Sequence, residues 1–199
     1  MTRTVRVLHA VAPALVLGST QPAGDVDAAA ARAAGVDVVR RRSGGGAVLV
    51  GPGGVLWVDV LLPVGDPLWE DDVGRAAWWV GETWASALEA AGAGEATVWR
   101  DGARRTQWSA KVCFGGVGPG EVLVGGRKVV GVSQRRTRRG ALFQTAVLLR
   151  WDPGEILGLL ALPENVRRRG ADALRAAAGG VGAGRAGRVE HAFLAALMP

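Results

Sequence analysis

Clusters of glycine divide this chain into short apolar segments. Glycine accounts for 31 of the 199 residues, and it is concentrated at residues 43–46, 51–54 and 115–120. The clusters lack the every-third-residue period that a collagen triple helix requires, so that fold is excluded. Because glycine marks turns and close approaches of the backbone, we expect short strands joined by tight turns.

The apolar segments between the glycines predict a sheet with helices. Strands are expected over residues 4–9, 14–18, 36–41, 47–50, 55–62, 98–100, 112–114, 122–124, 128–133 and 141–150. Helices are expected over 25–34, 70–91 and 152–162, and a basic helical tail over 167–199 is interrupted at 179–187. Residues 101–102 and 125–126 are typical of hairpin turns. This order predicts one α+β domain, residues 1–199, in which a mixed β-sheet is flanked by helices.

The chain is basic, with 24 lysines and arginines and a formal net charge of +6. Such a charge suits nucleic acid, an acidic membrane surface or an acidic protein. The basic runs at 135–139 and 167–169 lack interleaved aromatic residues and match no helix-turn-helix, zinc-finger or RNA-recognition signature. We therefore expect an acidic protein partner, with no nucleic acid and no membrane.

The rare reactive residue types restrict the chemistry. A single cysteine, Cys113, excludes an internal disulfide and a multi-thiolate zinc site. His9 and His191 have no ligand partner at helical spacing, so no metal is expected. The apolar run 7–17 mimics a secretory signal, but His9 and Pro13 interrupt it. No apolar stretch reaches the ~18 residues that span a bilayer, and we expect a cytoplasmic protein.

The most informative segment is Arg40-Arg41-Arg42-Ser43-Gly44-Gly45-Gly46-Ala47-Val48. Three consecutive glycines let a ligand approach the backbone, and arginines bind a carboxylate or a phosphate. A flexible turn with solvated arginines explains the same pattern. The segment is neither the Gly-x-Gly-x-x-Gly fingerprint of dinucleotide binding nor a phosphate-binding loop with Gly-Lys-Ser/Thr.

A second segment contains one of only two lysines in the chain, Lys128. It lies on a predicted strand beside glycines, in Gly125-Gly126-Arg127-Lys128-Val129-Val130-Gly131-Val132-Ser133-Gln134. An exposed lysine is ordinarily a solvated charge. In a site, it would place a compact cation near a developing negative charge.

Together the two segments resemble the biotin/lipoate protein ligase superfamily, in its lipoate-protein ligase and octanoyltransferase branch. The family patterns are Arg-Arg-x-Ser-Gly-Gly-Gly-Ala-Val and, later in the chain, Gly-x-Lys-x-x-Gly-x-Ala-Gln. Residues 40–48 and 126–134 match them in order, with Ser133 in the place of the alanine. The resemblance covers residues 5–152. It implies a class II aminoacyl-tRNA-synthetase-like catalytic domain that attaches an octanoyl or lipoyl group to a lysine of a lipoyl carrier domain, of the dehydrogenase E2 or glycine-cleavage H protein type.

The resemblance also implies roles for particular residues. Lys128 and Cys113 would be catalytic. The substrate would be bound by Arg40, Arg41, Ser43, Gly44, Gly45, Gly46, Ala47, Gly126, Gly131 and Ser133. No metal ligand is implied.

Cys113 separates two mechanisms within this branch. Cysteine-type octanoyltransferases place a Cys-Phe pair before a Glu-hydrophobic strand and the lysine motif, as Cys113-Phe114, Glu121 and Lys128 stand here. A thiolate could then accept the acyl group from acyl-carrier protein without a cofactor. The alternatives are an acyl-adenylate made with ATP and Mg, or a Cys113 that is simply a buried small hydrophobe.

Several departures from the family pattern leave a third reading open. The family's His-Asp-x-Gly-Asn is replaced by residues 50–54, and a later His-Gly pair by Gln144-Thr145. The family's N-terminal helix has no counterpart, and residues 153–199 are too short and glycine-broken for an accessory domain. A non-catalytic relative that binds acyl ligands or a carrier protein would also fit these departures.

Overall fold

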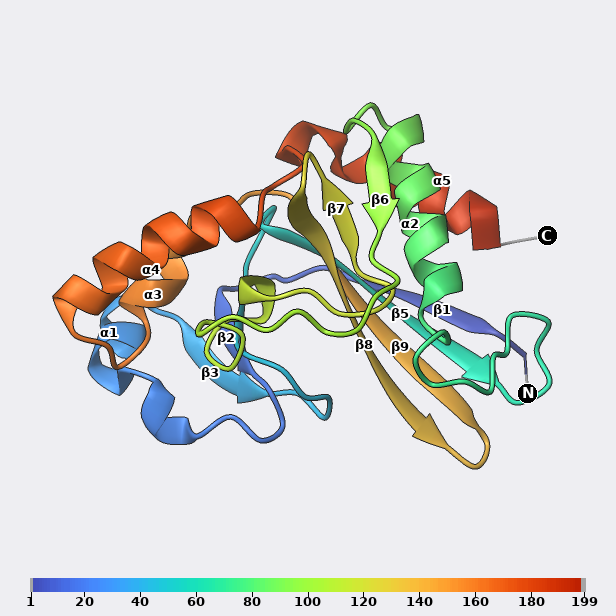
Figure 1. Ribbon diagram of the computed structural model, residues 1–199. Coiled ribbons are helices and arrows are strands. Elements are labelled where there is room, and N and C mark those ends of the chain that lie inside the picture. Colours follow the sequence, from blue (N-terminus) through green and yellow to red (C-terminus); the bar gives the residue numbers. More distant parts are fainter. Residues whose placement is uncertain (1, 198–199) are drawn as a thin grey trace.

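The computed structural model describes residues 2–197 and contains two β-sheets. The large sheet has six strands in the order β1-β5-β9-β8-β7-β6, and every neighbouring pair is antiparallel. Its strands are β1 (Thr4–Leu8), β5 (Val55–Pro63), β9 (Gly140–Leu148), β8 (Arg127–Thr137), β7 (Val122–Val124) and β6 (Ala96–Val98). Two helices, α2 (Trp78–Ala90) and α5 (Ala186–Leu197), cover one face of this sheet (Figure 1).

The main core lies between that face and the two helices. Alternate residues of β5 point into it, including Val58 and Val60, as a half-buried strand requires. Trp84 of α2 stacks on Phe193 of α5, with ring centres 3.6 Å apart. The opposite face of the large sheet, which we call the open face, is not covered by α2 and α5 and carries the cavity described below.

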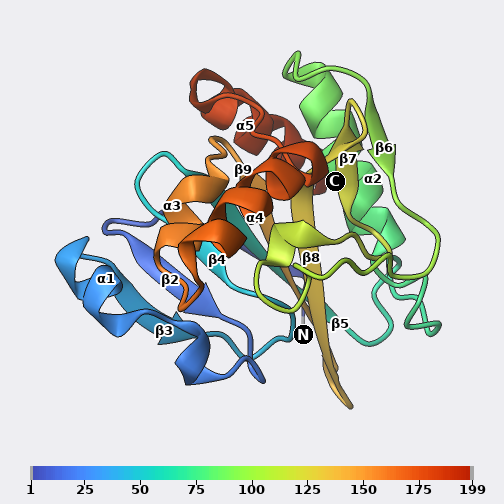
Figure 2. The same ribbon diagram turned by 60° about the vertical axis from the view of Figure 1, so that its left-hand side comes forward.

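The small sheet has three strands in the order β3-β2-β4. They are β2 (Ala14–Leu17), β3 (Asp37–Arg40) and β4 (Val48–Val50). β2 and β3 are parallel and are connected through a 3-10 turn (Ala23–Asp25) and α1 (Ala28–Ala33), whereas β2 and β4 are antiparallel. Helices α3 (Pro153–Gly158) and α4 (Glu164–Ala177) lie beside this sheet, and α3 shares a buried apolar cluster with it (Figure 2).

The expected α+β class is confirmed, with one correction to its sheet. The strands form two sheets, and the only parallel pairing among the described strands lies in the small one. The predicted turn at 125–126 joins β7 to β8, where both glycines have positive φ. The predicted cap is also present, because the Asp152 carboxylate accepts from the Gly154 N–H and Pro153 begins α3.

Three local predictions were wrong for identifiable reasons. The helix expected from residue 70 begins at Trp78, since the Asp72 carboxylate accepts from two nearby backbone N–H groups and holds a turn before it. Residues 101–102 make no hairpin, because β6 pairs with β7 across the long connection 99–121. The strand expected at 112–114 is a 3-10 turn, Cys113–Gly115, closed by the Gly115 N–H on the Val112 carbonyl.

None of the described helices combines the length and apolar character needed to cross a bilayer.

Candidate functional site

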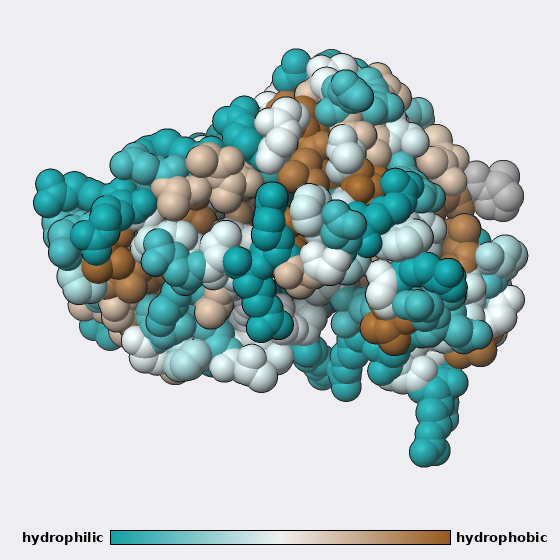
Figure 3. Space-filling view, in the orientation of Figure 1, coloured by the Kyte–Doolittle hydropathy of each residue, from teal (hydrophilic) through white to brown (hydrophobic). Residues whose placement is uncertain are grey.

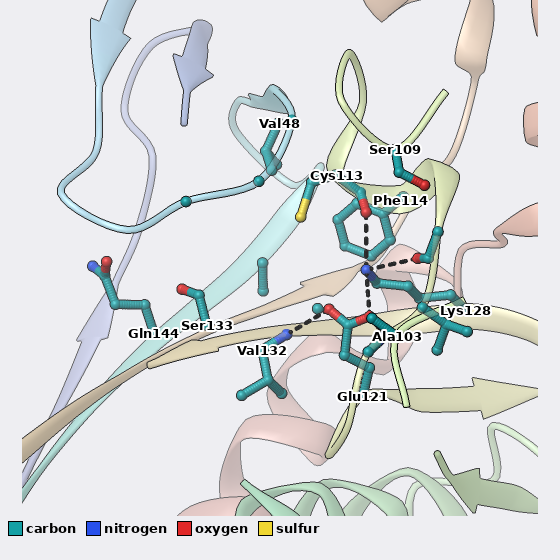
Figure 4. A pocket seen from close by; sticks show the side chains of 18 of the residues that line it. Val48, Ala103, Ser109, Cys113, Phe114, Glu121, Lys128, Val132, Ser133 and Gln144 are labelled. Atoms are coloured by element: carbon teal, nitrogen blue, oxygen red, sulfur yellow. Dashed lines mark hydrogen bonds and ion pairs between the residues drawn. The ribbon is translucent and has the colours of Figure 1, made fainter. Parts of the chain in front are cut away.

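A cavity of about 330 Å³ lies between the small sheet and the open face of the large sheet. It is lined by the glycine loop, which we define as residues 43–47, by the connection 99–121, and by strands β8 and β9. Figure 4 shows Cys113, Lys128, Ser133 and Gln144 around it. In Figure 3 the surface is hollowed between the parts that contain the two sheets, and hydrophilic side chains rim the hollow. The two motifs of the sequence therefore meet at one cavity.

A β-bulge aims Lys128 at this cavity. In a regular strand Lys128 and Val130 would share a face, because side chains alternate. Val130 is instead in the main core, whereas Lys128 and Gly131 line the cavity. The pairing of β7 with β8 shifts register between Val122 and Leu123. The extra residue reverses the alternation, which is how bulges re-aim side chains beside sites.

The Lys128 ammonium is fully hydrogen-bonded within the protein. Its Nζ donates to the backbone oxygens of Cys113 at 2.9 Å and Gly116 at 3.1 Å. It also pairs with Glu121 Oε2 at 2.7 Å, and the two side chains are only 3% and 7% exposed. Because an ammonium has three donors, each one has an acceptor. Lys128 thus neutralises a buried carboxylate and holds the turn that carries Cys113.

Glu121 is the centre of this arrangement. Its Oε2 accepts from the Gly118 N–H at 2.7 Å, and its Oε1 accepts from the Val132 N–H at 3.2 Å. With Lys128, the carboxylate has partners on the connection 99–121 and on β8. Charge-assisted bonds of this kind are the strong ones, so Glu121 fixes the wall of the cavity.

Cys113 is attached to the glycine loop through its backbone. Its N–H donates to the Ala47 carbonyl at 2.9 Å, and the Ala47 N–H donates to the Lys111 carbonyl at 2.9 Å. The side chain is half-buried, and its sulfur points into the cavity (Figure 4). A group entering the cavity can therefore reach the thiol.

The glycine loop needs glycine at two of its positions. A Cβ on Gly46 would lie 2.5 Å from the Val112 backbone nitrogen. Gly45 has a φ of 96°, and a Cβ there would lie 2.9 Å from Arg41 Nη2. Gly44, in contrast, faces open space. The backbone at 45–46 consequently forms the cavity wall itself.

Arg41 cross-links this loop to β2. Its guanidinium donates to the carbonyl oxygens of Val16 at 3.1 Å, Gly44 at 2.6 Å and Gly46 at 2.9 Å. Burial lowers the pKa of Arg41, and the charge of Cys113 opposes that effect by raising it. Since arginine stays protonated at neutral pH, Arg41 places a positive charge near the sulfur.

A chain of hydrogen bonds joins the glycine loop to the open face of the large sheet. Ser133 Oγ donates to Ser43 Oγ at 3.1 Å, and Ser43 Oγ donates to Gln144 Oε1 at 3.2 Å. Gln144 Nε2 in turn donates to Asp59 Oδ1 at 3.4 Å, which also accepts from Trp57 Nε1 at 2.8 Å. The two sheets are thereby held at a defined spacing around the cavity.

The family model described as "Lipoyl protein ligase A/B catalytic domain" matches residues 2–181. The chain belongs to this family. Its members are enzymes of lipoyl and octanoyl transfer, and the resemblance found in the two motifs is thereby confirmed. No curated protein matches the chain in sequence.

Solved lipoate protein ligases have the same fold as this family member. A bipartite lipoate protein ligase from Thermoplasma acidophilum, described with its E2 lipoyl domain, has a TM-score of 0.73 and 19% identity, with 98% of this chain and 69% of that chain covered. A lipoate-protein ligase A bound with ATP has a TM-score of 0.68 and 19% identity, with coverage of 98% and 71%. P. falciparum LipL1 in complex with lipoate has a TM-score of 0.65 and 13% identity, with coverage of 98% and 48%. At these identities the likeness establishes the fold.

Most of the residues predicted for the site lie at the cavity of this family member. Those that line it are Lys128, Cys113, Arg41, Gly44, Gly45, Gly46, Gly131 and Ser133. Ser43 is buried next to them and acts through its hydrogen bonds to Ser133 and Gln144.

Three predicted residues do not line the cavity. Arg40 points away from it and donates to the carbonyls of Gly18 and Gln21, so it shapes the turn after β2. Ala47 is fully buried, and only its backbone serves the site. Gly126 lies in the exposed β7–β8 turn, where its positive φ accounts for the glycine.

Other lining residues were missed by the analysis of the sequence. The pattern assigned Glu121 only to the start of a Glu-hydrophobic strand, although an acid directly after the glycine cluster 115–120 and near one of the two lysines could have suggested a pair. Gln144 was read only as a lost histidine. Arg104 and Arg105 carried no motif at all, and their place depends on the long connection that no periodicity predicts.

Proposed function

We propose that this protein transfers an octanoyl or lipoyl group to the acceptor lysine of a lipoyl carrier domain through a thioester on Cys113. The observation that carries the proposal is the half-buried Cys113, whose sulfur faces the same cavity as Lys128 and the glycine loop. The donor in this reading is an acyl thioester on acyl-carrier protein, and no cofactor is required.

The first step exchanges one thioester for another. The Cys113 thiolate attacks the acyl carbonyl, its S–C bond forms, and the C–S bond to the donor breaks. The donor leaves as a thiol and takes up the proton that Cys113 gave up on forming the thiolate. Arg41 supplies positive charge near the sulfur, and the thiolate is the form of a cysteine that attacks an acyl carbonyl.

The second step forms the amide. The neutral amine of the acceptor lysine attacks the Cys113 thioester, the N–C bond forms and the S–C bond breaks. The proton lost by the amine balances the Cys113 thiolate, which regains a thiol. The glycine loop would lie along the acyl chain, and Lys128 would keep the Cys113 turn in place.

A second candidate is ATP-dependent ligation through an acyl-adenylate. It is favoured by the positive residues around the cavity, Arg41, Arg104, Arg105 and Lys128, and by the structural neighbour bound with ATP. Of these cations, Arg104 and Arg105 have side chains without a hydrogen bond or ion pair among residues 2–197 and fit nucleotide phosphates, whereas the donors of Arg41 and Lys128 already have protein acceptors. Glu121 is the only carboxylate among the lining residues of the described chain, and Lys128 already engages it. A Mg²⁺ ion would therefore rely on phosphate and water oxygens, which it commonly uses.

Intact-mass spectrometry tests the proposal. The protein is incubated with octanoyl-acyl-carrier protein, and the acyl adduct is looked for on the enzyme and then on an added apo lipoyl domain. We expect an octanoyl adduct on the wild type, none on Cys113→Ser under the same conditions, and transfer to the domain. A matched arm supplies octanoate with ATP and Mg²⁺.

Each outcome of this experiment assigns a function. Transfer by Cys113→Ser from octanoate and ATP would replace the thioester route with ligation. Binding of octanoyl-lysine without an adduct in either arm would identify a non-catalytic relative and refute both routes.

A further inference from the structure

Arg104 and Arg105 are exposed residues that line the cavity, and hydrogen bonds on the segment 104–106 fix its backbone. The Arg104 N–H donates to the Val117 carbonyl at 2.8 Å, and the Val117 N–H donates back at 3.1 Å. Thr106 Oγ1 donates to the Gly115 carbonyl at 2.5 Å. Residues 104–106 are thus fastened to residues 115–117, which follow Cys113 and Phe114 directly.

These two arginines differ from the other cations at the cavity. The donors of Lys128 and Arg41 are directed at protein acceptors, as described above. Among residues 2–197, neither the Arg104 nor the Arg105 side chain has a hydrogen bond or an ion pair. The Arg104 guanidinium lies over the Trp99 ring, with its central carbon 4.8 Å from the ring centre, and this contact uses none of its N–H donors in a hydrogen bond to residues 2–197.

The acyl group does not explain this free positive charge. An octanoyl thioester is neutral, and the only lining carboxylate in the described chain, Glu121, is neutralised by Lys128. Two exposed arginines that line the same cavity as Cys113 match a dianionic or monoanionic phosphate, which arginine binds with paired N–H donors.

We infer that Arg104 and Arg105 form a subsite for a phosphate group of the acyl donor. The inference rests on the proposed function for the identity of that donor. The same chemistry has two sources: the phosphopantetheine arm of an acyl-carrier protein and the phosphate of an acyl-adenylate. The subsite would hold the donor by its charged end while the acyl carbonyl reaches Cys113.

Binding measurements with matched donors test the subsite without relying on turnover. Calorimetry compares octanoyl-pantetheine with octanoyl-phosphopantetheine, and octanoyl-adenosine with octanoyl-AMP, on Cys113→Ser so that no acyl group is lost. We expect the phosphate to tighten Kd about tenfold in one of the pairs. In Arg105→Ala that ratio should fall to about twofold or less.

Arg138→Ala is the matched control, because Arg138 is an exposed arginine in the β8–β9 turn and does not line the cavity. The Arg138→Ala variant should keep the same ratio of Kd values between the donors without and with phosphate as the protein with both arginines. A phosphate effect in the pantetheine pair assigns the carrier arm, and one in the adenosine pair assigns the nucleotide. No phosphate effect in either pair, or an equal loss in Arg138→Ala, overturns the inference. Failure of acyl transfer with all donors would refute the proposed function. The Kd ratios would still test the phosphate subsite, because they do not depend on turnover.

Discussion

Replacing Lys128 by methionine should destabilise the protein strongly before any effect on chemistry is considered. The substitution keeps a chain of similar length but removes the charge that neutralises Glu121, whose side chain is 7% exposed. Removing one partner of a buried ion pair costs about 3–5 kcal/mol, because the other charge is left uncompensated. The carbonyls of Cys113 and Gly116 also lose their donor. We expect Lys128→Met to lower the free energy of unfolding by about 4 kcal/mol.

A double-mutant cycle separates the ion pair from other effects. Glu121→Gln makes the partner neutral, so the double variant Lys128→Met/Glu121→Gln should be more stable than Lys128→Met by about 1–2 kcal/mol. Urea unfolding at neutral pH, followed by tryptophan fluorescence, measures the free energy of unfolding of the wild type, the two single variants and the double variant. A loss below about 1 kcal/mol in Lys128→Met, or strict additivity of the two substitutions, would refute the buried pair. A fall in activity of Lys128→Met counts as chemistry only after this correction.

The remaining predictions concern the loop, the cavity wall and the N-terminal strand. Gly46→Ala should destabilise the fold by about 1–3 kcal/mol through overpacking, whereas Gly44→Ala, which faces open space, should leave the urea midpoint unchanged. Gly131→Ala should fold normally, since the added Cβ would meet its neighbours at 3.4 Å or more. It should raise the KM for an octanoyl donor in steady-state assays, because the methyl group narrows the cavity. An unchanged KM would show that the acyl chain binds elsewhere. Burial raises the pKa of Asp66, but the hydrogen bonds from the Arg3 side chain and the Leu68 N–H, together with the charge of Arg3, outweigh that effect and the pKa is lowered. Asp66→Asn should therefore cost about 1 kcal/mol or less at neutral pH, and the difference from wild type should disappear as acid protonates the carboxyl; a difference that persists in acid unfolding would contradict this.

The residues that could be assigned from sequence were those whose role depends on local backbone. Gly45 and Gly46 of the glycine loop belong to this group, because a positive φ or a close approach of backbone requires glycine wherever the fold places it. The cap of α3 and the turn at 125–126 were predicted for the same reason.

Residues whose role depends on side-chain direction were harder to assign. Arg40 and Arg41 are adjacent and both fit the motif, yet only Arg41 reaches the cavity. A one-residue bulge makes Lys128 face the site. The apolar pattern of the following residues, Val129 and Val130, does not indicate where a bulge occurs. The connection 99–121 has no periodicity, so the positions of Glu121 and Arg105 depend on tertiary contacts that no local pattern encodes.

The departures from the family pattern have a physical counterpart in the hydrogen-bond chain from Ser133 to Asp59. Gln144 stands where the resemblance implies a histidine, and both ends of its amide have partners. Loss of the Gln144 amide without compensation would leave the Ser43 hydroxyl without its acceptor, at a cost of about 1–3 kcal/mol, and would leave Asp59 with the Trp57 indole N–H as its remaining donor. Ser43 instead donates to Gln144, and Asp59 accepts from it. The glutamine therefore preserves the hydrogen bonds that connect the glycine loop to the large sheet. Unlike a histidine, it does not titrate near neutral pH. The geometry of the cavity consequently does not depend on a histidine.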